Sequence, residues 1–179
     1  MEKSGRALVV IDLLEDFVRP GAPLEVPRTR EILPAVRRRI GRARRAGELV
    51  VYLCDAHKKN DPEFSRMGWP AHAVAGTKGA GVVTEISPEP GDVVVEKKSY
   101  SGFYRTSLQS VLRRHGVREV DLAGCVTNIC ILYIGAEAAI RGYDVTVDEA
   151  LVAGLDDASH AFALDQMETV FGIRVIRRS

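Results

Sequence analysis

Short apolar runs alternate with amphipathic segments along the chain, and this alternation constrains the fold more than any other feature. Runs rich in β-branched residues are typical of buried parallel strands. Six of them occur, at residues 7–11, 49–53, 93–95, 120–123, 145–147 and 173–176. Helix-type periodicity fills four of the gaps, at residues 32–46, 106–115, 130–141 and 158–171. Each predicted helix is followed by glycine, the residue preferred just after a helix C-terminus.

A repeated order of strand, helix and glycine predicts βαβ units with right-handed crossovers. We therefore expect an α/β fold: a three-layer α/β/α, Rossmann-like domain with a mostly parallel sheet of about six strands. The 179 residues fit one domain spanning 1–179, and no repeat, low-complexity stretch or linker divides them. A chain of this length can bury a core without help from a disulfide or a structural metal.

Composition excludes several classes of function. Twenty-five basic residues balance 24 acidic ones, which predicts no nucleic-acid partner and no membrane partner. No apolar run approaches the ~18 residues that a membrane span needs, and the N-terminus lacks the features of a signal peptide. Three cysteines are few, and an odd number cannot all pair, so a disulfide scaffold is not expected. Because disulfides are rare in the reducing cytosol, we expect a cytoplasmic protein. Six arginines within residues 37–45 are expected to form the solvated face of a helix.

Polar residues follow four consecutive predicted strands. Asp12, Asp55 and Lys97 close the first three, and a turn ending at Cys130 follows the fourth. Ligands of open parallel sheets bind beyond the carboxyl ends of the strands, so these side chains are expected at the edge of the sheet where a ligand binds. Taken singly, each has a plainer interpretation as a helix cap, a surface lysine or a small buried thiol. Their common position favours a catalytic site.

Cys130 is the candidate nucleophile. It falls where a turn passes into a helix, near free N–H groups and the positive end of the helix dipole. Lys97 is expected to lower the pKa of its thiol, and Asp12 to accept the proton. Cys125 precedes the turn, Cys54 lies in a strand pattern, and His160 in the last helix is expected to be structural or peripheral.

The segment at about 56–90 has little periodicity, which makes it a long functional or disordered loop. It contains the only tryptophan and two of the four histidines. Asp55, His57 and His72 could form a metal site open to substrate, with Glu63 as a fourth ligand, and such a set suits Zn²⁺, Fe²⁺ or Mn²⁺. Turn and cap hydrogen bonds would explain the same residues equally well.

Three segments resemble a known family over nearly the whole chain. Residues 9–17 (VVIDLLEDF), 94–103 (VVEKKSYSGF) and 122–130 (LAGCVTNIC) are similar to motifs of the isochorismatase-like cysteine hydrolases. The resemblance implies a catalytic Asp12, Lys97 and Cys130. It also implies a cis peptide bond between Val126 and Thr127, and an oxyanion hole formed by the Val126 and Cys130 N–H groups.

Within that superfamily the chain is most similar to the nicotinamidases. Asp55-Ala56-His57 with residues 69–79 (WPAHAVAGTKG) resembles their D-x-H and P-x-H-x-x-x-G-T-x-G metal pattern. This implies one divalent metal, zinc first with iron or manganese as alternatives, held by Asp55, His57 and His72. Glu63 resembles the extra glutamate ligand of one nicotinamidase branch. The aromatic residues expected to enclose a flat pyridine ring are Phe17, Trp69 and Tyr100. The family also implies a homo-oligomer, either a dimer or a tetramer.

The resemblance implies hydrolysis of nicotinamide to nicotinate and ammonia through a cysteine thioester, with pyrazinamide as a related substrate. Leu14, Asp61, Asn128 and Glu149 depart from the usual pattern, which leaves the substrate and the fourth ligand open. One alternative keeps the three catalytic residues but acts on another small amide or carbamoyl compound. A second alternative is a catalytically silent binding module.

Overall fold

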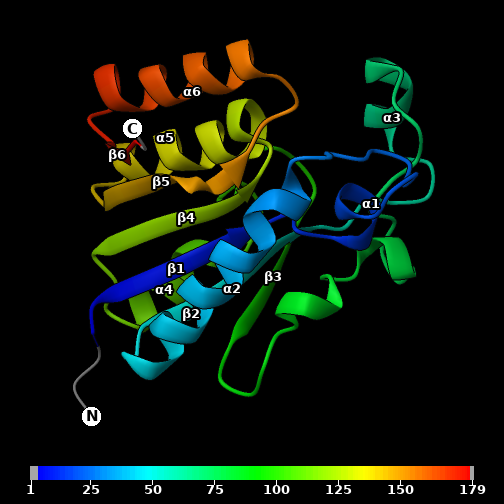
Figure 1. Cartoon of the computed structure of the whole chain (residues 1–179). Coiled ribbons are helices and arrows are strands. Elements are labelled where there is room, and N and C mark those ends of the chain that lie inside the picture. Colours follow the sequence, from blue (N-terminus) through cyan, green and yellow to red (C-terminus); the bar gives the residue numbers. More distant parts are fainter. Residues whose placement is uncertain (1–3, 178–179) are drawn as a thin grey trace.

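A single six-stranded sheet runs through the protein. The computed structural model describes residues 4–177, and every strand pair in it is parallel, in the order β3-β2-β1-β4-β5-β6 (Figure 1). The strands are β1 (Arg6–Ile11), β2 (Leu49–Asp55), β3 (Val93–Lys97), β4 (Glu119–Cys125), β5 (Asp144–Ala153) and β6 (Arg174–Ile176). The predicted α/β class with six parallel strands is confirmed.

Helices cover both faces of this sheet. The helices that do so are α2 (Thr29–Arg45), α4 (Leu108–Arg114), α5 (Leu132–Ile140) and α6 (Asp157–Thr169). Two short helices, α1 (Glu15–Val18) and α3 (Pro62–Met67), lie elsewhere. Two 3₁₀ turns, η1 (Lys78–Ala80) and η2 (Thr84–Ile86), and one π-helical turn, η3 (Thr127–Ile131), complete the set. The segment at about 56–90 thus contains only short elements, as its weak periodicity predicted.

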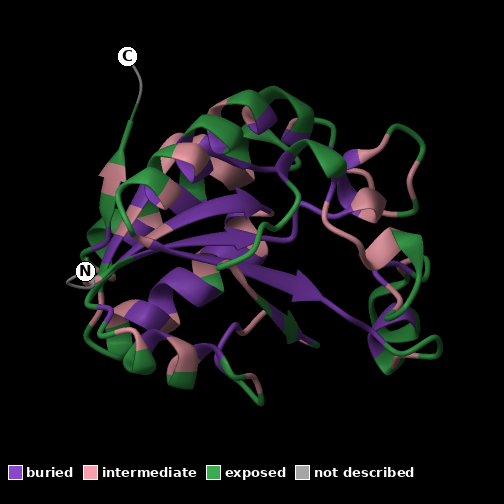
Figure 2. Cartoon of the chain, turned by 90° about the horizontal axis from the view of Figure 1, so that it is seen from below, coloured by how far each residue is buried: buried purple, intermediate pink, exposed green. Residues whose placement is uncertain are grey.

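Alternate residues of β1 divide the core into two halves, because successive strand side chains point to opposite faces. Val9 and Ile11 pack with residues of α4, α5 and α6, whereas Leu8 and Val10 pack with residues of α1 and α2. Figure 2 shows the buried strands between helices whose outer surfaces are exposed. This is the expected three-layer arrangement.

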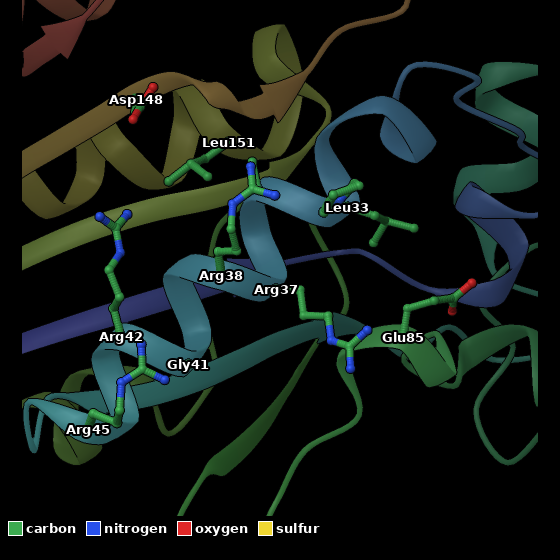
Figure 3. A pocket seen from close by; sticks show the side chains of 11 residues that line it. Leu33, Arg37, Arg38, Gly41, Arg42, Arg45, Glu85, Asp148 and Leu151 are labelled. Carbon is green, nitrogen blue, oxygen red and sulfur yellow. The ribbon is translucent and has the colours of Figure 1, made fainter.

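The arginine-rich part of α2 differs in part from the expected solvated face. Arg39 is buried, and its guanidinium lies 2.6 Å from both Glu48 and Asp121. Asp121 pairs in register with Leu8 and so points to the face that α2 covers. Arg44 likewise pairs with Asp92, at 2.6 Å. The exposed remainder lines an open surface hollow of about 950 Å³ (Figure 3): Arg37, Arg38, Arg42 and Arg45.

Among the described residues, no helix has both the length and the apolar character needed to cross a membrane.

The strand order places a crevice at the middle of the sheet. From β1 the chain proceeds to β2 and β3 on one side, and β4, β5 and β6 lie on the other. Such a reversal is where open α/β sheets bind ligands, beyond the carboxyl ends of the strands. Helices α1 and α3 lie beyond that edge in Figure 1, and all the candidate catalytic residues follow strands that end there.

Gly124 allows β4 to approach β1 closely at this edge. Its φ is +125°, and a Cβ added to it would lie only 1.9 Å from the carbonyl oxygen of Ile11. Gly124→Ala should therefore lower the free energy of unfolding by roughly 2 kcal/mol or more, since it combines backbone strain with a clash. Urea denaturation measures the change.

Gly41→Ala is the matched control. Gly41 lies inside α2, and its added Cβ would meet only the Arg45 side chain, at 3.4 Å. Because alanine is the better helix former, this change should raise the free energy of unfolding by up to about 1 kcal/mol. Equal effects of the two substitutions would contradict the close approach at Gly124.

Candidate active site

Four strand ends bring the predicted catalytic residues into contact around one lysine. The Lys97 Nζ lies 2.7 Å from Asp12 Oδ2 and donates hydrogen bonds to Asp55 Oδ1, at 2.5 Å, and to Cys130 Sγ, at 3.4 Å. All four residues are buried. The structure thus places Asp12, Lys97 and Cys130 as the sequence predicted, and their catalytic roles stay a prediction.

The backbone after β1 directs Asp12 toward its neighbours. Asp12 adopts a left-handed conformation, with φ +53°, which aspartate tolerates better than most residues. Its N–H donates to the Leu53 carbonyl, at 3.1 Å, and its Oδ1 accepts the Asp55 N–H, at 2.8 Å. These two hydrogen bonds fix the Asp12 carboxylate across the end of β2.

The two carboxylates have different proton affinities. Burial and the nearby Asp55 raise the pKa of Asp12 to about 6, against the opposing effect of Lys97. Burial would also raise the pKa of Asp55, but Lys97 and His57 hold it below its ordinary value. Burial disfavours the Lys97 ammonium, yet Asp12 and Asp55 hold its pKa well above the ordinary value. Asp12 is therefore the group suited to accept and return a proton near neutral pH.

The expected low pKa of the Cys130 thiol is corrected by the structure. Burial raises that pKa well above its usual value, and the opposing effect of Lys97 is smaller. Sequence could not show how completely this thiol is removed from water. A thiol with a raised pKa is protonated near neutral pH, so a nucleophilic attack by Cys130 would need a base.

The other two cysteines lie in different surroundings. Burial also raises the pKa of the Cys54 and Cys125 thiols. Cys125 donates a hydrogen bond to the backbone carbonyl of Asp12, at 3.1 Å, and Cys54 packs in the core on the α2 side of the sheet. Cys130 is the thiol that accepts a hydrogen bond from Lys97, so this contact favours it as the nucleophile.

Cys130 lies in η3, the turn that leads into α5. The carbonyl of Val126 accepts the N–H groups of both Ile129, at 3.0 Å, and Ile131, at 3.2 Å. The cis peptide bond joins Cys125 to Val126, so its predicted position between Val126 and Thr127 was wrong by one bond. No proline is present here, and the sequence therefore had no signal for which bond is cis. The oxyanion role of the Val126 and Cys130 N–H groups stays a prediction.

Backbone pairing in the middle segment brings the candidate metal ligands together. The His57 N–H donates to the Ala73 carbonyl and the Ala75 N–H donates to the His57 carbonyl, both at 2.9 Å. Ligand atoms of Asp55, His57 and His72 consequently lie within 4.8 Å of one another, and all three residues are buried.

The donor set fits a divalent metal. The Nδ1 of His72 lies 2.9 Å from the Pro70 carbonyl, and the Nδ1 of His57 lies 3.3 Å from Asp61 Oδ2, which leaves the Nε2 of each ring as a ligand atom. Metal-bound histidines are typically oriented by such outer contacts. The His57 Nδ1 is nevertheless buried without a well-formed hydrogen bond. Two imidazoles and a carboxylate are a common ligand set for Zn²⁺ or Fe²⁺.

Two residues support this cluster in ways that the sequence did not predict. Asp61 caps α3 by accepting the Glu63 N–H, at 3.0 Å, and also faces His57. Phe64 packs against the His57 and His72 rings, with centroids 5.3 and 5.0 Å apart. Asp-Pro-Glu is an N-cap pattern that could have predicted α3. Glu63 groups with His57 and Asp61 rather than with His72, so its role as a ligand stays a prediction.

Asp16 anchors the segment that carries His72. Its Oδ2 accepts the Ala73 N–H, at 2.8 Å, and a Cβ on Gly79 would lie 2.1 Å from the same oxygen. Ala73 itself has a φ of +44°. Asp16 lies beside Phe17 in the first motif, but no sequence pattern indicated this role.

A small cavity opens beside Cys130. It measures about 30 Å³, space for a few water molecules at most, and its wall includes the three predicted aromatic residues Phe17, Trp69 and Tyr100. The Tyr100 ring also stacks on Tyr133, which is half exposed, with ring centroids 6.1 Å apart. The three aromatic rings in its wall suit a flat substrate, although contact of these residues with a substrate stays a prediction.

Comparisons with known proteins agree with this architecture. The isochorismatase domain model matches residues 6–177. The chain is 37% identical to the N-carbamoylsarcosine amidase of Thermoplasma acidophilum, covering 96% of this chain and 95% of that one, with a TM-score of 0.86.

Two further solved structures are similar. The pyrazinamidase of Pyrococcus horikoshii in complex with zinc is 31% identical, with coverage of 97% and 99% and a TM-score of 0.90. The pyrazinamidase/nicotinamidase of Streptococcus mutans is 28% identical, with coverage of 96% and 99% and a TM-score of 0.89.

The metal cluster predicts a measurable affinity for zinc. Chelator-treated protein should bind one Zn²⁺ per chain, and His72→Ala should weaken binding at least tenfold because it removes a ligand. Competition with a chromogenic chelator measures the affinity. His115→Ala, in which the lost imidazole lies at the end of α4, is the matched control and should bind zinc like the wild type. Equal zinc affinity in wild type and His72→Ala would contradict the assignment.

Proposed function

This chain belongs to the isochorismatase family of hydrolases, and we propose that it is a nicotinamidase, which hydrolyses nicotinamide to nicotinate and ammonia. The observation that carries the proposal is the cluster of Asp55, His57 and His72 beside the cavity of Cys130. The same three residues gave the sequence its resemblance to nicotinamidases. Two of the similar solved structures bear the name pyrazinamidase, one of them with zinc.

The chain's own residues would position the substrate. Phe17, Trp69 and Tyr100 would enclose a planar ring, since aromatic rings pack well against one another. A zinc ion at the cluster would supply a Lewis acid for the ring nitrogen. The carboxamide carbon would then face Cys130, and its oxygen the N–H groups of Val126 and Cys130.

Chemistry would begin with a proton transfer. Asp12 takes the proton of the Cys130 thiol while the sulfur attacks the carboxamide carbon, and the N–H groups stabilise the oxyanion that forms. Lys97 holds its positive charge beside both groups. Asp12 then gives the proton to the nitrogen, ammonia leaves, and a thioester remains. Water, deprotonated by Asp12, hydrolyses that thioester and releases the carboxylate and the free thiol.

A second candidate is an amidase of a small carbamoyl compound. The higher identity to N-carbamoylsarcosine amidase, 37% against 31% for the zinc-bound pyrazinamidase, favours it. The same attack by Cys130 would serve this chemistry. The nicotinamidase proposal also includes a cytoplasmic location, assembly into a homo-oligomer and a place in NAD salvage.

Ammonia release distinguishes the two candidates. The zinc-loaded protein should release ammonia from nicotinamide, and chelation should abolish the release until zinc is restored. N-carbamoyl amino acids are assayed in parallel. Release from these alone by the zinc-loaded protein would overturn the nicotinamidase proposal in favour of the second candidate.

Cys130→Ala should lower turnover at least 10³-fold, because no other thiol contacts Lys97 in the described structure. It should still bind nicotinamide, which calorimetry can measure. Cys54→Ala is the matched control, because Cys54 is a buried thiol packed outside the cavity, and it should keep near-normal turnover. Substantial turnover by Cys130→Ala would contradict the mechanism.

The pKa of Asp12 predicts an acid limit of activity. Asp12 must be ionised to take the thiol proton, and burial raises its pKa to about 6. The value of kcat/KM should consequently fall about tenfold per pH unit below pH 6. Zinc content is measured at each pH, since protonation of the histidine ligands also releases metal. Constant kcat/KM down to pH 4.5, with zinc retained, would contradict the role of Asp12.

A further inference from the structure

A histidine of α6 contacts the turn that carries Cys130. The Nδ1 of His160 lies 2.8 Å from Thr127 Oγ1. Thr127 is completely buried and is the first residue of η3, three positions before Cys130. From the sequence, His160 is expected to be structural or peripheral, and this contact connects it to the turn that carries Cys130.

The position of His160 is closely defined by its surroundings. Asp156 caps α6 by accepting the Ser159 N–H, at 2.8 Å, and its carbonyl accepts the His160 N–H, at 3.1 Å. The other ring nitrogen, Nε2, lies 3.7 Å from Glu149 Oε1. A Cβ on Gly154 would lie 2.9 Å from the His160 Cβ and 3.3 Å from its Nδ1. Glycine is therefore the residue that leaves room for the imidazole.

Carboxylate, imidazole and hydroxyl follow one another here in the order found in hydrolase triads. Thr127 cannot act as a nucleophile, however, because it has no exposed surface and does not line the cavity. Burial lowers the pKa of His160, so the ring is neutral at neutral pH. A neutral ring that carries its proton on Nε2, the nitrogen on the side of Glu149, would accept the Thr127 hydroxyl at Nδ1.

We propose that His160 is a positioning residue that holds η3, and with it Cys130 and the N–H groups beside it, through the Thr127 hydroxyl. This role rests on the proposed function of Cys130 as nucleophile. Val126 precedes Thr127, and its carbonyl accepts two N–H groups of the turn. A rotation at Thr127 therefore moves both proposed oxyanion donors. Misplacement by about 1 Å at a reacting centre can cost about 100-fold in rate.

Two pairs of variants separate positioning from simple packing. Thr127→Val keeps the shape and loses the hydroxyl, and His160→Leu loses the ring nitrogen. Each should lower kcat for the hydrolysed amide about 10- to 100-fold with little change in KM, because the turn acts in the transition state. Thr127→Ser keeps the hydroxyl and His160→Asn keeps a hydrogen-bond acceptor at the contact. Both variants should therefore retain most of the wild-type kcat.

The double variant Thr127→Val/His160→Leu tests whether the two residues act together. It should be no slower than the worse single variant, because both remove one interaction. His115→Leu is the matched control: His115 also bonds through Nδ1, at 2.9 Å to the Val111 carbonyl, but in α4, and its kcat should be unchanged. Melting temperatures show that each protein folds.

Cys130 alkylation gives a readout that needs no substrate. The rate of modification by iodoacetamide, resolved by peptide mass spectrometry with Cys54 as internal reference, should change at least threefold in Thr127→Val and return with Thr127→Ser. The alkylation rate separates failure of the proposed function from failure of the positioning role. If only the proposed function is wrong, no amide is hydrolysed but the alkylation rate of Cys130 still changes in Thr127→Val. Unchanged alkylation and kcat in folded Thr127→Val, or multiplicative losses in the double variant, would overturn the positioning role.

Discussion

The buried ammonium of Lys97 is the charge on which the rest of the site depends. An ion removed from water is stable only when oppositely charged or hydrogen-bonding groups surround it. Asp55 supplies one such group from the end of β2, and Asp12 supplies the other from the end of β1. Asp55 therefore has two functions, since its Oδ1 contacts Lys97 while its Oδ2 lies 3.6 Å from His57. Charge balance thus connects the candidate nucleophile to the candidate metal site.

Much of this site could be predicted from sequence, because the parallel sheet assembles whatever follows its strands. Asp12 follows β1, Asp55 and Lys97 end β2 and β3, and Cys130 lies in the turn after β4. Topology alone therefore puts all four residues at one edge of the sheet. The pairing of His57 with His72 needed the family resemblance, since a loop without periodicity does not determine which residues meet.

The rest depended on burial and register. The raised pKa of the Cys130 thiol follows from burial that a strand pattern does not reveal. Arg39 belongs to a basic face by sequence, and only the register of β4 shows that Asp121 is beneath it. The contact of His160 with Thr127 joins residues 33 positions apart through the packing of α6.

Lys97 is supplied by β3, which is an outer strand of the sheet and pairs only with β2 in the described structure. Outer strands open more readily than central ones, because fewer contacts hold them. When β3 separates, the two carboxylates lose their shared cation, and their mutual repulsion opposes the packing of the strand ends. Loss of the pairing between β2 and β3 would therefore also remove the central cation of the site, so the site depends on a strand at the margin of the sheet.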